Sequence, residues 1–496
     1  MASTKIVGLP RVIILGGIAL IFGCTVSLGW HFLMLEQRVE AFPANYRLPR
    51  IPGGIPLRMA MIHDVIHERY LKHGTAWYET RNTQARAVIA VEEAKDGAAP
   101  EKFWDAYDDL AVGLERLHQS DAAAEVMRKK LALLPPLPAS ATQQVGDPND
   151  ERAELQRIIA AQSMPMIPHH HYTAHANLGT FLIHGSFAGA AAGDAKAKAQ
   201  LAEGLAHIEQ SIALNPAAHS GRENWQAIAV RHFLTGIDDP EFLTKYDMVG
   251  NDMSHITIGS AGTLGLAYPL ADFDAPRALD KRIGNRETIK KVGLDPKWRE
   301  AVHPAYNSPR PFDEPVLGLL GMWTLGGGPN PNSALALGHI AEQVGQLEIA
   351  WNAYERALEM QDRFSPREDV RKALVEHCLA RQRAIAEIKA RTDDWSGPMR
   401  QKHRDELAWG EQYQKDYQAF EAKQIAAGVA LDDPHFYDAF FAGRASIASD
   451  PGRVDDVEVV YKAPHGMIDA LPTGLLAAGV VMMLGAFMTK QRGSTA

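Results

Sequence analysis

Two long apolar runs, one near each end of the chain, restrict the possible folds more than any other feature. Residues 12–35 read VIILGGIALIFGCTVSLGWHFLML, and residues 471–488 read LPTGLLAAGVVMMLGAFM. A transmembrane helix needs about 20 mostly apolar residues, so each run predicts one membrane-spanning helix. Two crossings put both termini on the same side of the membrane. The region from Glu36 to Asp469 is then a large extramembrane body that is tethered at both ends.

The residues around these runs indicate the compartment. A cleaved signal peptide is the alternative for residues 12–35, but that run is long for a signal peptide and no A-x-A cleavage site follows it. Lys490 and Arg492 follow the second run, and positive charge favours the cytoplasmic side. No N-x-S/T sequon occurs in the chain, which favours a bacterial protein. We therefore expect the bacterial inner membrane, with both termini cytoplasmic and the main body periplasmic.

Ala19, Gly23 and Ser27 form a stripe of small residues along the first predicted span. Such a stripe lets another helix approach closely in a membrane. The approaching helix would be the chain's own second span or a helix of another subunit, so a homo-oligomer is one possible assembly. A chance spacing in a helix rich in glycine and alanine is the alternative, and the sequence leaves both open.

Composition excludes several classes of protein. The chain has 496 residues, of which 46% are hydrophobic, and this suffices for a large buried core. The formal net charge is −9 and no basic tract is interleaved with aromatic residues, which argues against nucleic acid as a partner. The only cysteines are Cys24 and Cys378. They are too few for a disulfide framework, a zinc ribbon, an iron–sulfur cluster or a C-x-x-C-H haem attachment.

Residues 106–135, AYDDLAVGLERLHQSDAAAEVMRKKLALLP, have the pattern of a helical hairpin. The first predicted helix places four residues on one face: Tyr107, Leu110, Ala111 and Leu114. The second places three residues on its facing side: Ala123, Met127 and Lys130. Pro135 closes the unit, because proline cannot continue a helix.

Residues 334–362, ALALGHIAEQVGQLEIAWNAYERALEMQD, repeat this pattern more closely. Small residues at 338, 350 and 357 would let two antiparallel helices touch, while Leu337 and Tyr354 fill the space between them. A leucine, a small residue and an aromatic residue at these offsets resemble the tetratricopeptide (TPR) repeat. The resemblance implies stacked helix pairs with a binding groove, and it implies no reaction.

A third copy of the pattern is split. Its halves are HANLGTFLIHG, residues 175–185, and LAEGLAHIEQSIALNP, residues 201–216. We expect the residues between them to form either a loop extension or a lengthened helix. Residues 238–331 are rich in glycine, proline and aspartate and predict an irregular insertion.

Two long charged helices are predicted after the last repeat, at about residues 367–391 and 397–427. The second carries an aromatic stripe, which is typical of a buried core face: Trp409, Tyr413, Tyr417 and Phe420. The resulting divisions are a tail (1–11), a transmembrane helix (12–35), a juxtamembrane helical region (36–100), TPR-like repeats (101–237), the insertion (238–331), a TPR-like repeat (332–366), long helices (367–428), a linker (429–470), a transmembrane helix (471–488) and a tail (489–496).

The segment HDVIH begins at His63 and ends at His67, and it differs by one methylene from the H-E-x-x-H motif of zinc proteases. On a helix these two histidines project from one face and could share a zinc or copper ion, with Glu68 or His73 near enough to help. The aspartate is shorter than the usual glutamate base and no third-ligand motif follows, so we expect no protease chemistry. The alternative is an amphipathic helix capped by Gly74, in which the histidines are structural or face the solvent.

A second cluster, HHHYTAH, contains His169, His170, His171 and His175. His171 and His175 share one helix face, and His184 lies in the same predicted helix. Three imidazoles could hold zinc or copper in an open site. Alternatively, these histidines form hydrogen bonds at the start of a helix or titrate near neutral pH.

Two other segments are weaker candidates for a binding site. The segment GGGPNPN, residues 326–332, could bind an anion at a helix N-terminus, but a plain turn with an Asn or Ser cap is the simpler interpretation. His31 follows Trp30 at the end of the first predicted span. It could be an axial ligand of a macrocycle, or an ordinary histidine at the membrane interface.

The sequence thus predicts an all-α fold: a TPR-like helical-hairpin solenoid with an irregular central insertion, flanked by one N-terminal and one C-terminal transmembrane helix. The expected function is a membrane-anchored scaffold for protein–protein interactions in a bacterial envelope complex, with other membrane or envelope proteins and lipid as partners. No catalytic residue and no cofactor are expected. The alternative is a metal-binding or metalloenzyme subunit with zinc or copper at His63 and His67 or at the His169–His175 cluster.

Overall fold

The computed structural model describes residues 54–95, 100–137, 165–215, 222–251, 253, 315–344, 346–389 and 394–448. Within these ranges the chain forms helices and no β-strand, so the all-α prediction is confirmed. The predicted spans, residues 12–35 and 471–488, lie outside the described residues, as do the Ala19, Gly23, Ser27 stripe and His31. Among the described helices, none has both the length and the apolar character needed to cross a bilayer.

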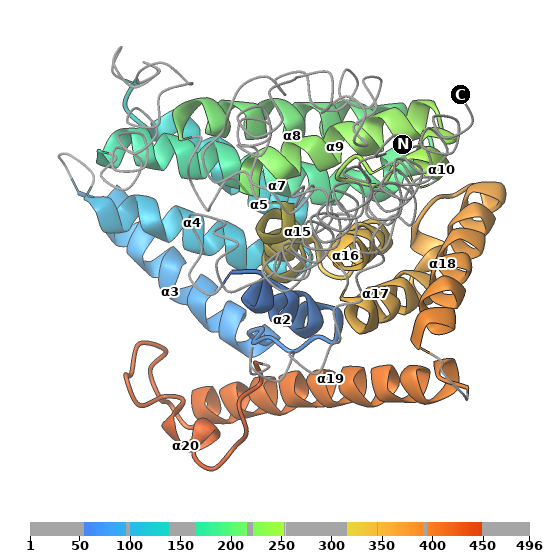
Figure 1. Ribbon diagram of the computed structural model, residues 1–496. Helices are drawn as coiled ribbons and strands as arrows, with labels where there is room; N and C mark the ends of the chain where they lie inside the picture. The colour runs from blue at the N-terminus through green and yellow to red at the C-terminus, as the bar shows by residue number, and fades with distance from the viewer. Residues whose placement is uncertain are drawn as a thin grey trace, which may run out of the picture.

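The helices divide into three groups along the chain (Figure 1). The first group is α2 (Gly54–Ile66) and the array α3 (Thr75–Glu93), α4 (Glu101–Arg116), α5 (Ser120–Leu133), α7 (Met166–Ala191), α8 (Ala195–Leu214) and α9 (Arg222–Asp238). The second is α10 (Phe242–Lys245), α15 (Pro315–Met322), a π-helical turn (Trp323–Gly327), α16 (Pro331–Val344) and α17 (Leu347–Glu359). The third is a 3₁₀ turn (Gln361–Arg363), α18 (Glu368–Lys389), α19 (Ser396–Ala426) and α20 (Asp438–Phe441).

The hairpin predicted at residues 106–135 is formed by α4 and α5, which pack against each other. The predicted core residues of both helices are buried, including Tyr107 and Leu110 of α4 and Met127 of α5. Lys130 is also fully buried, although it is charged. The predicted faces of this hairpin are therefore confirmed.

The hairpin predicted at residues 334–362 is formed by α16 and α17. A Cβ atom at Gly338 would lie 2.7 Å from the ring of Tyr354, so the glycine allows the close approach of the two helices. Ala350 and Ala357 are fully buried in α17. The small residues thus lie where the pattern predicts.

The split repeat is formed by α7 and α8, and both helices are longer than a repeat requires. The inserted residues extend the two helices and leave only a tight turn between them, where Gly193 has a φ of +92°. The Asp194 side chain then caps α8, because its Oδ1 accepts from the backbone N–H of Lys196 at 2.8 Å. A lengthened helix is therefore the correct alternative of the two.

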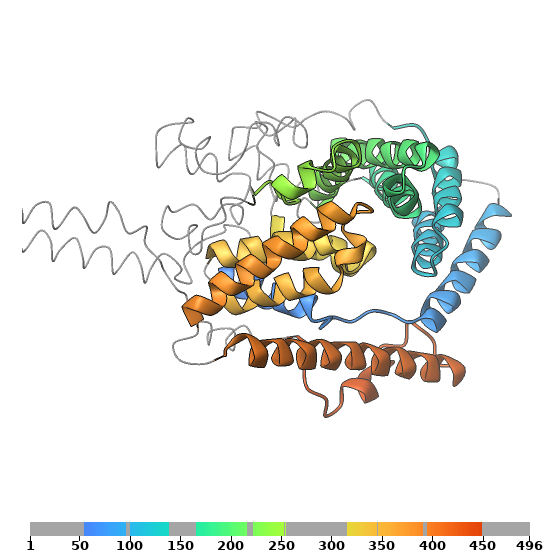
Figure 2. The ribbon, with the colours of Figure 1, turned by 90° about the vertical axis from the view of Figure 1, so that its right-hand side faces the viewer.

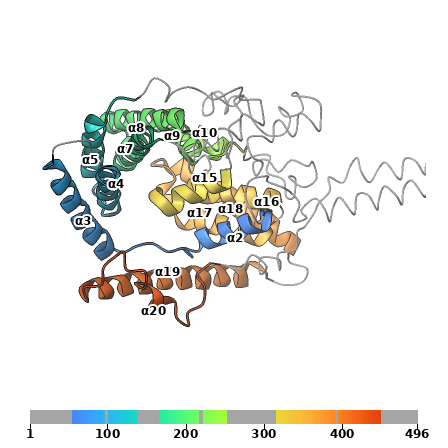
Figure 3. The same ribbon diagram turned by 90° about the vertical axis from the view of Figure 1, so that its left-hand side faces the viewer.

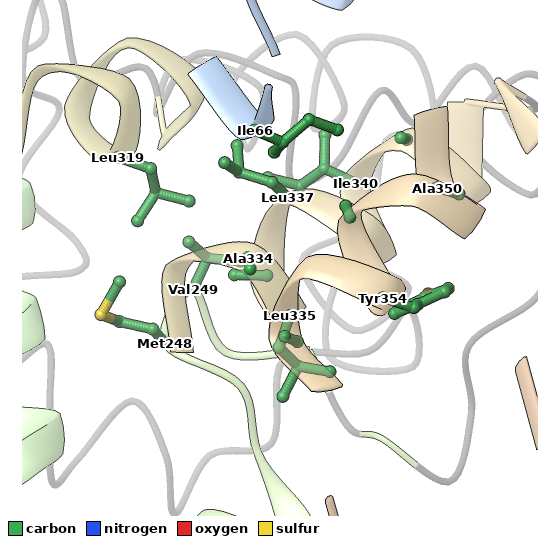
Figure 4. Packing of buried hydrophobic residues seen from close by; sticks show 14 of the residues in the cluster. Ile66, Met248, Val249, Leu319, Ala334, Leu335, Leu337, Ile340, Ala350 and Tyr354 are labelled. Atoms are coloured by element: carbon green, nitrogen blue, oxygen red, sulfur yellow. The ribbon is translucent and has the colours of Figure 1, made fainter. Parts of the chain in front are cut away.

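From α3 to α9, each helix of the array packs on the next one in chain order. In Figures 2 and 3 these helices follow an arc, and α2 and α15–α18 lie inside it. The inner helices share one hydrophobic core, and α9 joins them through its contact with α15. Figure 4 shows Ile66 of α2 beside Leu337 and Ile340 of α16 in this core.

The segment between α2 and α3, residues 67–74, is hereafter the connector, and it lies along α19 (Figure 1). Three α19 side chains bind its backbone: Gln414 donates to Glu68 O at 2.8 Å, Gln418 donates to Lys72 O at 3.2 Å, and Glu421 accepts from Gly74 N at 2.8 Å. A Cβ atom at Gly410 would lie 2.1 Å from His67 O, so the helix backbone touches the connector directly.

The connector changes the predicted role of Gly74. This glycine has extended backbone angles and precedes α3, so it begins a helix and does not end the helix that carries HDVIH. The earlier helix, α2, already ends at Ile66. The chain leaves the helix at Glu68, where φ is +54° and Arg69 N donates to Asp64 O at 2.7 Å, and α19 then binds the backbone that follows.

The aromatic stripe of α19 is partly core. Tyr413 and Tyr417 are buried and pack with Phe440, which belongs to α20. Trp409 is 38% exposed, and the guanidinium of Arg69 from the connector lies 4.5 Å from its ring centroid. The stripe thus fastens both the connector and the segment after α19 to this helix.

Candidate functional site

The two histidines of HDVIH lie at the junction of α2 and the connector. His67 is fully buried, and its Nδ1 donates to the backbone carbonyl of His63 at 2.8 Å. Its Nε2 therefore accepts, and the Nδ1 of His403 in α19 lies 3.1 Å away. Burial lowers the pKa of His67 well below its ordinary value, so the ring stays neutral. Both of its nitrogens serve the structure, and a metal ion at His67 would have to replace the contact with His403.

The two residues expected to assist that pair have other partners. The Glu68 carboxylate accepts from Tyr70 at 2.7 Å, Arg356 at 3.1 Å and Trp323 at 3.3 Å. Glu68 also has a φ of +54°, which is unusual for a residue with a side chain. His73 is paired with the buried carboxylate of Glu421 and stacks on a tryptophan. These contacts hold the connector in place between α2 and α3.

The histidines of HHHYTAH lie in the first turns of α7 and point to different neighbours. His170 faces the Lys130 ammonium, and His171 Nε2 donates to the Pro135 carbonyl at 2.8 Å. His175 faces His207 of α8, with 2.9 Å between the two Nδ1 atoms. Farther along α7, His184 Nδ1 lies 2.7 Å from a Glu115 carboxylate oxygen. The structure therefore places His171 and His175 against separate partners.

Among the described residues, the one group of at least three potential metal ligands within 4.8 Å is Asp105, Asp108 and His170. The Lys130 ammonium lies within this group, 2.6 Å from Asp108 Oδ2 and 3.4 Å from His170 Nδ1. Thr173 accepts a third hydrogen bond from the same ammonium at 3.0 Å. Lysine thus supplies the positive charge that a metal ion would otherwise bring.

Burial dominates the electrostatics of this group. It raises the pKa of Asp108, lowers the pKa of Lys130 and lowers the pKa of His170 to about 3. The mutual attraction of Asp108 and Lys130 opposes the first two shifts. His170 is fully buried, and its Nε2 has no hydrogen-bond partner. The arrangement is a buried ion pair that joins α4, α5 and α7.

A second buried chain of polar groups lies among the inner helices, and sequence reasoning missed it. Asp247, after α10, accepts from Asn251 Nδ2 at 2.7 Å and from His339 Nδ1 at 2.8 Å. Because a carboxylate only accepts, His339 donates to it from Nδ1. The Nε2 of His339 then lies 2.8 Å from the Nε2 of His377 in α18, within hydrogen-bond distance. This contact links α16 and α18 through the core.

The sequence held only a weak signal for this chain of groups. His339 follows Gly338 in the repeat pattern, at a position that the register places near the facing helix. Its acidic partner lies 92 residues earlier, in the predicted irregular insertion, so no local spacing connects the two. Burial lowers the pKa of His377 to about 3, so this ring is neutral and can share one hydrogen bond with His339.

The glycine-rich segment at residues 326–332 forms a turn that begins α16. Asn330 caps the helix: its Oδ1 accepts from Asn332 N at 2.8 Å, and its carbonyl accepts from Ala334 N at 3.0 Å. Gly328 has a φ of +66°, which glycine adopts at little cost. The turn with an Asn cap is therefore confirmed.

Comparison with known proteins gives no relative for this chain. No family model, no curated protein and no solved structure matches it. The function must therefore be argued from the arrangement of its own residues.

Proposed function

We propose that this chain is a membrane-anchored scaffold of TPR-like helical hairpins that mediates protein–protein interactions in a bacterial envelope complex. The packing of α3 to α9 in chain order supports this proposal most directly. Stacked hairpins of this kind expose a long, nearly continuous surface, which is how repeat proteins bind partners. The partners would be other membrane or envelope proteins or a second copy of this chain.

The array also carries apolar side chains that its own core does not use. Val91 of α3 is 56% exposed, and Leu133 of α5 is 47% exposed. Single exposed apolar residues are common on soluble surfaces, so they do not by themselves define an interface. They do provide positions at which a partner's contact can be tested without changing the core.

The predicted spans at residues 12–35 and 471–488 add the second part of the proposal. Two membrane anchors would restrict the orientation of the body and raise its effective concentration toward membrane-bound partners. The connector supports the same idea, because it fastens the first described helix to the last long one. The array would thus be presented in a fixed orientation.

Site-specific photo-crosslinking in the native membrane tests the proposal. A photoreactive residue is placed at Val91 or Leu133 on the array, with Leu379 of α18 and Phe441 of α20 as matched exposed controls at 40% and 44% exposure. We expect the array positions to give one shared crosslinked envelope protein, identified by mass spectrometry, and the control positions to give none. Equal crosslinking at all four positions, or none at the array, would contradict the proposal.

A further inference from the structure

His175 and His207 differ from the other close histidine pairs of the described chain in being accessible. Their Nδ1 atoms are 2.9 Å apart and their ring centroids 5.1 Å apart, across the antiparallel pair α7 and α8. Both side chains are half-buried, so solvent reaches them. By contrast, His67 and His339 are fully buried in their own pairs. A dissolved ion can therefore reach the α7–α8 pair without unfolding the chain.

The two helices are held in position around this pair. One turn from each histidine, Gly179 of α7 and Gly204 of α8 touch, and a Cβ atom at Gly179 would lie 2.7 Å from the Gly204 carbonyl oxygen. This close backbone contact lies beside the two imidazoles, which face each other across the same helix pair. A pre-arranged pair of nitrogen ligands loses little freedom when it binds an ion.

The distance between the rings suits a metal ion after a small adjustment. Zinc binds imidazole nitrogen at about 2.0–2.1 Å in tetrahedral geometry, which separates two ligand nitrogens by about 3.3 Å. The observed 2.9 Å would have to widen by about 0.4 Å, within the range of a side-chain rotation. Imidazole ligands favour zinc and copper among the common divalent ions.

Two further potential ligands lie one helical turn from the pair, along α7 and along α8, and each would have to move to reach a shared ion, because neither forms a group of three ligands with the pair within 4.8 Å. His171 precedes His175 by one turn, and its Nε2 donates to the Pro135 carbonyl at 2.8 Å, so Nδ1 is the nitrogen that could bind an ion. A backbone carbonyl that holds the far nitrogen of a histidine is the usual support of a metal ligand. Glu203 precedes His207 by one turn on α8 and offers a carboxylate, although it now pairs with Arg128 at 3.1 Å.

We propose that His175 and His207 form a two-histidine site that binds a divalent zinc or copper ion across the α7–α8 hairpin, with His171 or Glu203 and water completing the coordination. The ion would fasten two neighbouring helices of the array from outside. This inference is independent of the scaffold function, because it depends only on these two helices.

Zinc titration of the full-length protein tests the site. The protein is purified in mild detergent without a histidine tag, stripped with a chelator, and titrated with zinc against a chromophoric competitor. We expect one zinc ion per chain, and at least a tenfold loss of affinity in His175→Gln and in His207→Gln. His435→Gln is the matched control, because His435 is exposed and pairs only with nearby acidic groups. Its affinity should equal that of the unaltered chain.

A second measurement separates loss of the ligand from loss of the fold. Hydrogen exchange around the α7–α8 turn should slow when zinc is added to the unaltered chain, and should not respond in the two variants. Circular dichroism must show the same helix content in all proteins. Unchanged zinc affinity in both variants, or the absence of stoichiometric binding in the unaltered chain, would overturn the proposal.

Discussion

Replacing Lys130 with methionine removes the positive half of the buried ion pair among α4, α5 and α7. Lys130 is fully buried, while the Asp108 side chain keeps 18% of its surface exposed. Methionine fills nearly the same volume, so the main change is electrostatic. The Asp108 carboxylate then keeps only its hydrogen bonds from Thr173 at 3.0 Å and Asn177 at 3.2 Å.

Removal of one partner from a buried ion pair costs about 3–5 kcal/mol, because the remaining charge is left without compensation. The partial exposure of Asp108 and its two remaining donors reduce this cost, so we expect Lys130→Met to lower the free energy of unfolding by about 3 kcal/mol. The double variant Lys130→Met/Asp108→Asn should recover more than half of the loss. The difference in free energy of unfolding between Lys130→Met and the unaltered chain should also become smaller as the pH falls, because protonation neutralises the Asp108 carboxylate.

Urea titration of the full-length protein, followed by circular dichroism, measures these differences. The neighbouring lysine provides the control: Lys129 is 55% exposed and pairs with a carboxylate that is 39% exposed. Lys129→Met should change the free energy of unfolding by less than about 0.5 kcal/mol. If Lys130→Met has an equally small effect, or the double variant is less stable than the single one, the reasoning about the buried pair is refuted.

Three further predictions concern two close glycine contacts and one buried histidine. Gly338→Ala should lower the free energy of unfolding by about 1–3 kcal/mol, because its Cβ would lie 2.7 Å from the Tyr354 ring; a loss below about 0.5 kcal/mol would contradict that packing. Gly410→Ala should push α19 away from the connector, because its Cβ would lie 2.1 Å from His67 O, and limited proteolysis should then cut the connector faster than in the unaltered chain. Burial lowers the pKa of His232 to about 4, whereas the pKa of a histidine in an unfolded chain is about 6.5. Between these two pH values the unfolded state therefore binds more protons than the folded state. Stability should therefore fall as the pH is lowered from 6.5 toward 4, by up to about 3 kcal/mol from this group, and His232→Phe should show a shallower pH dependence in urea titrations.

The parts of the fold that could be predicted are those whose contacts are local in sequence. Gly338 meets Tyr354 within one hairpin, so the repeat spacing already contains the contact. The burial of Tyr107 and Met127 follows in the same way from the helical period of residues 106–135. In such hairpins the two facing helices are adjacent in the chain, and their register leaves little choice of partner.

The polar clusters could not be predicted because their members come from distant segments. His67 and His403 are separated by 336 positions, and Asp247 and His339 by 92. Whether they meet depends on how the hairpins close on one another, which no local pattern encodes. The reversed role of Gly74 has the same cause, because α19 holds the connector in an extended form. The sequence marks His175 as a possible ligand, but its contact with His207 depends on the packing of α8 against α7, which no local spacing encodes.

The contact between the connector and α19 also has a consequence for synthesis on the ribosome. The three hydrogen bonds that satisfy the connector's backbone join residues 346 or 347 positions apart. At about 5–20 residues per second, the α19 side chains emerge about 17–70 s after the connector. During that interval the array can begin to fold, since its contacts lie between neighbours in the chain, whereas the connector lacks the α19 side chains that bind its backbone. Arrival of α19 would therefore fix the connector in place, and a chain truncated before Gln414 should leave the connector open to chaperones and proteases.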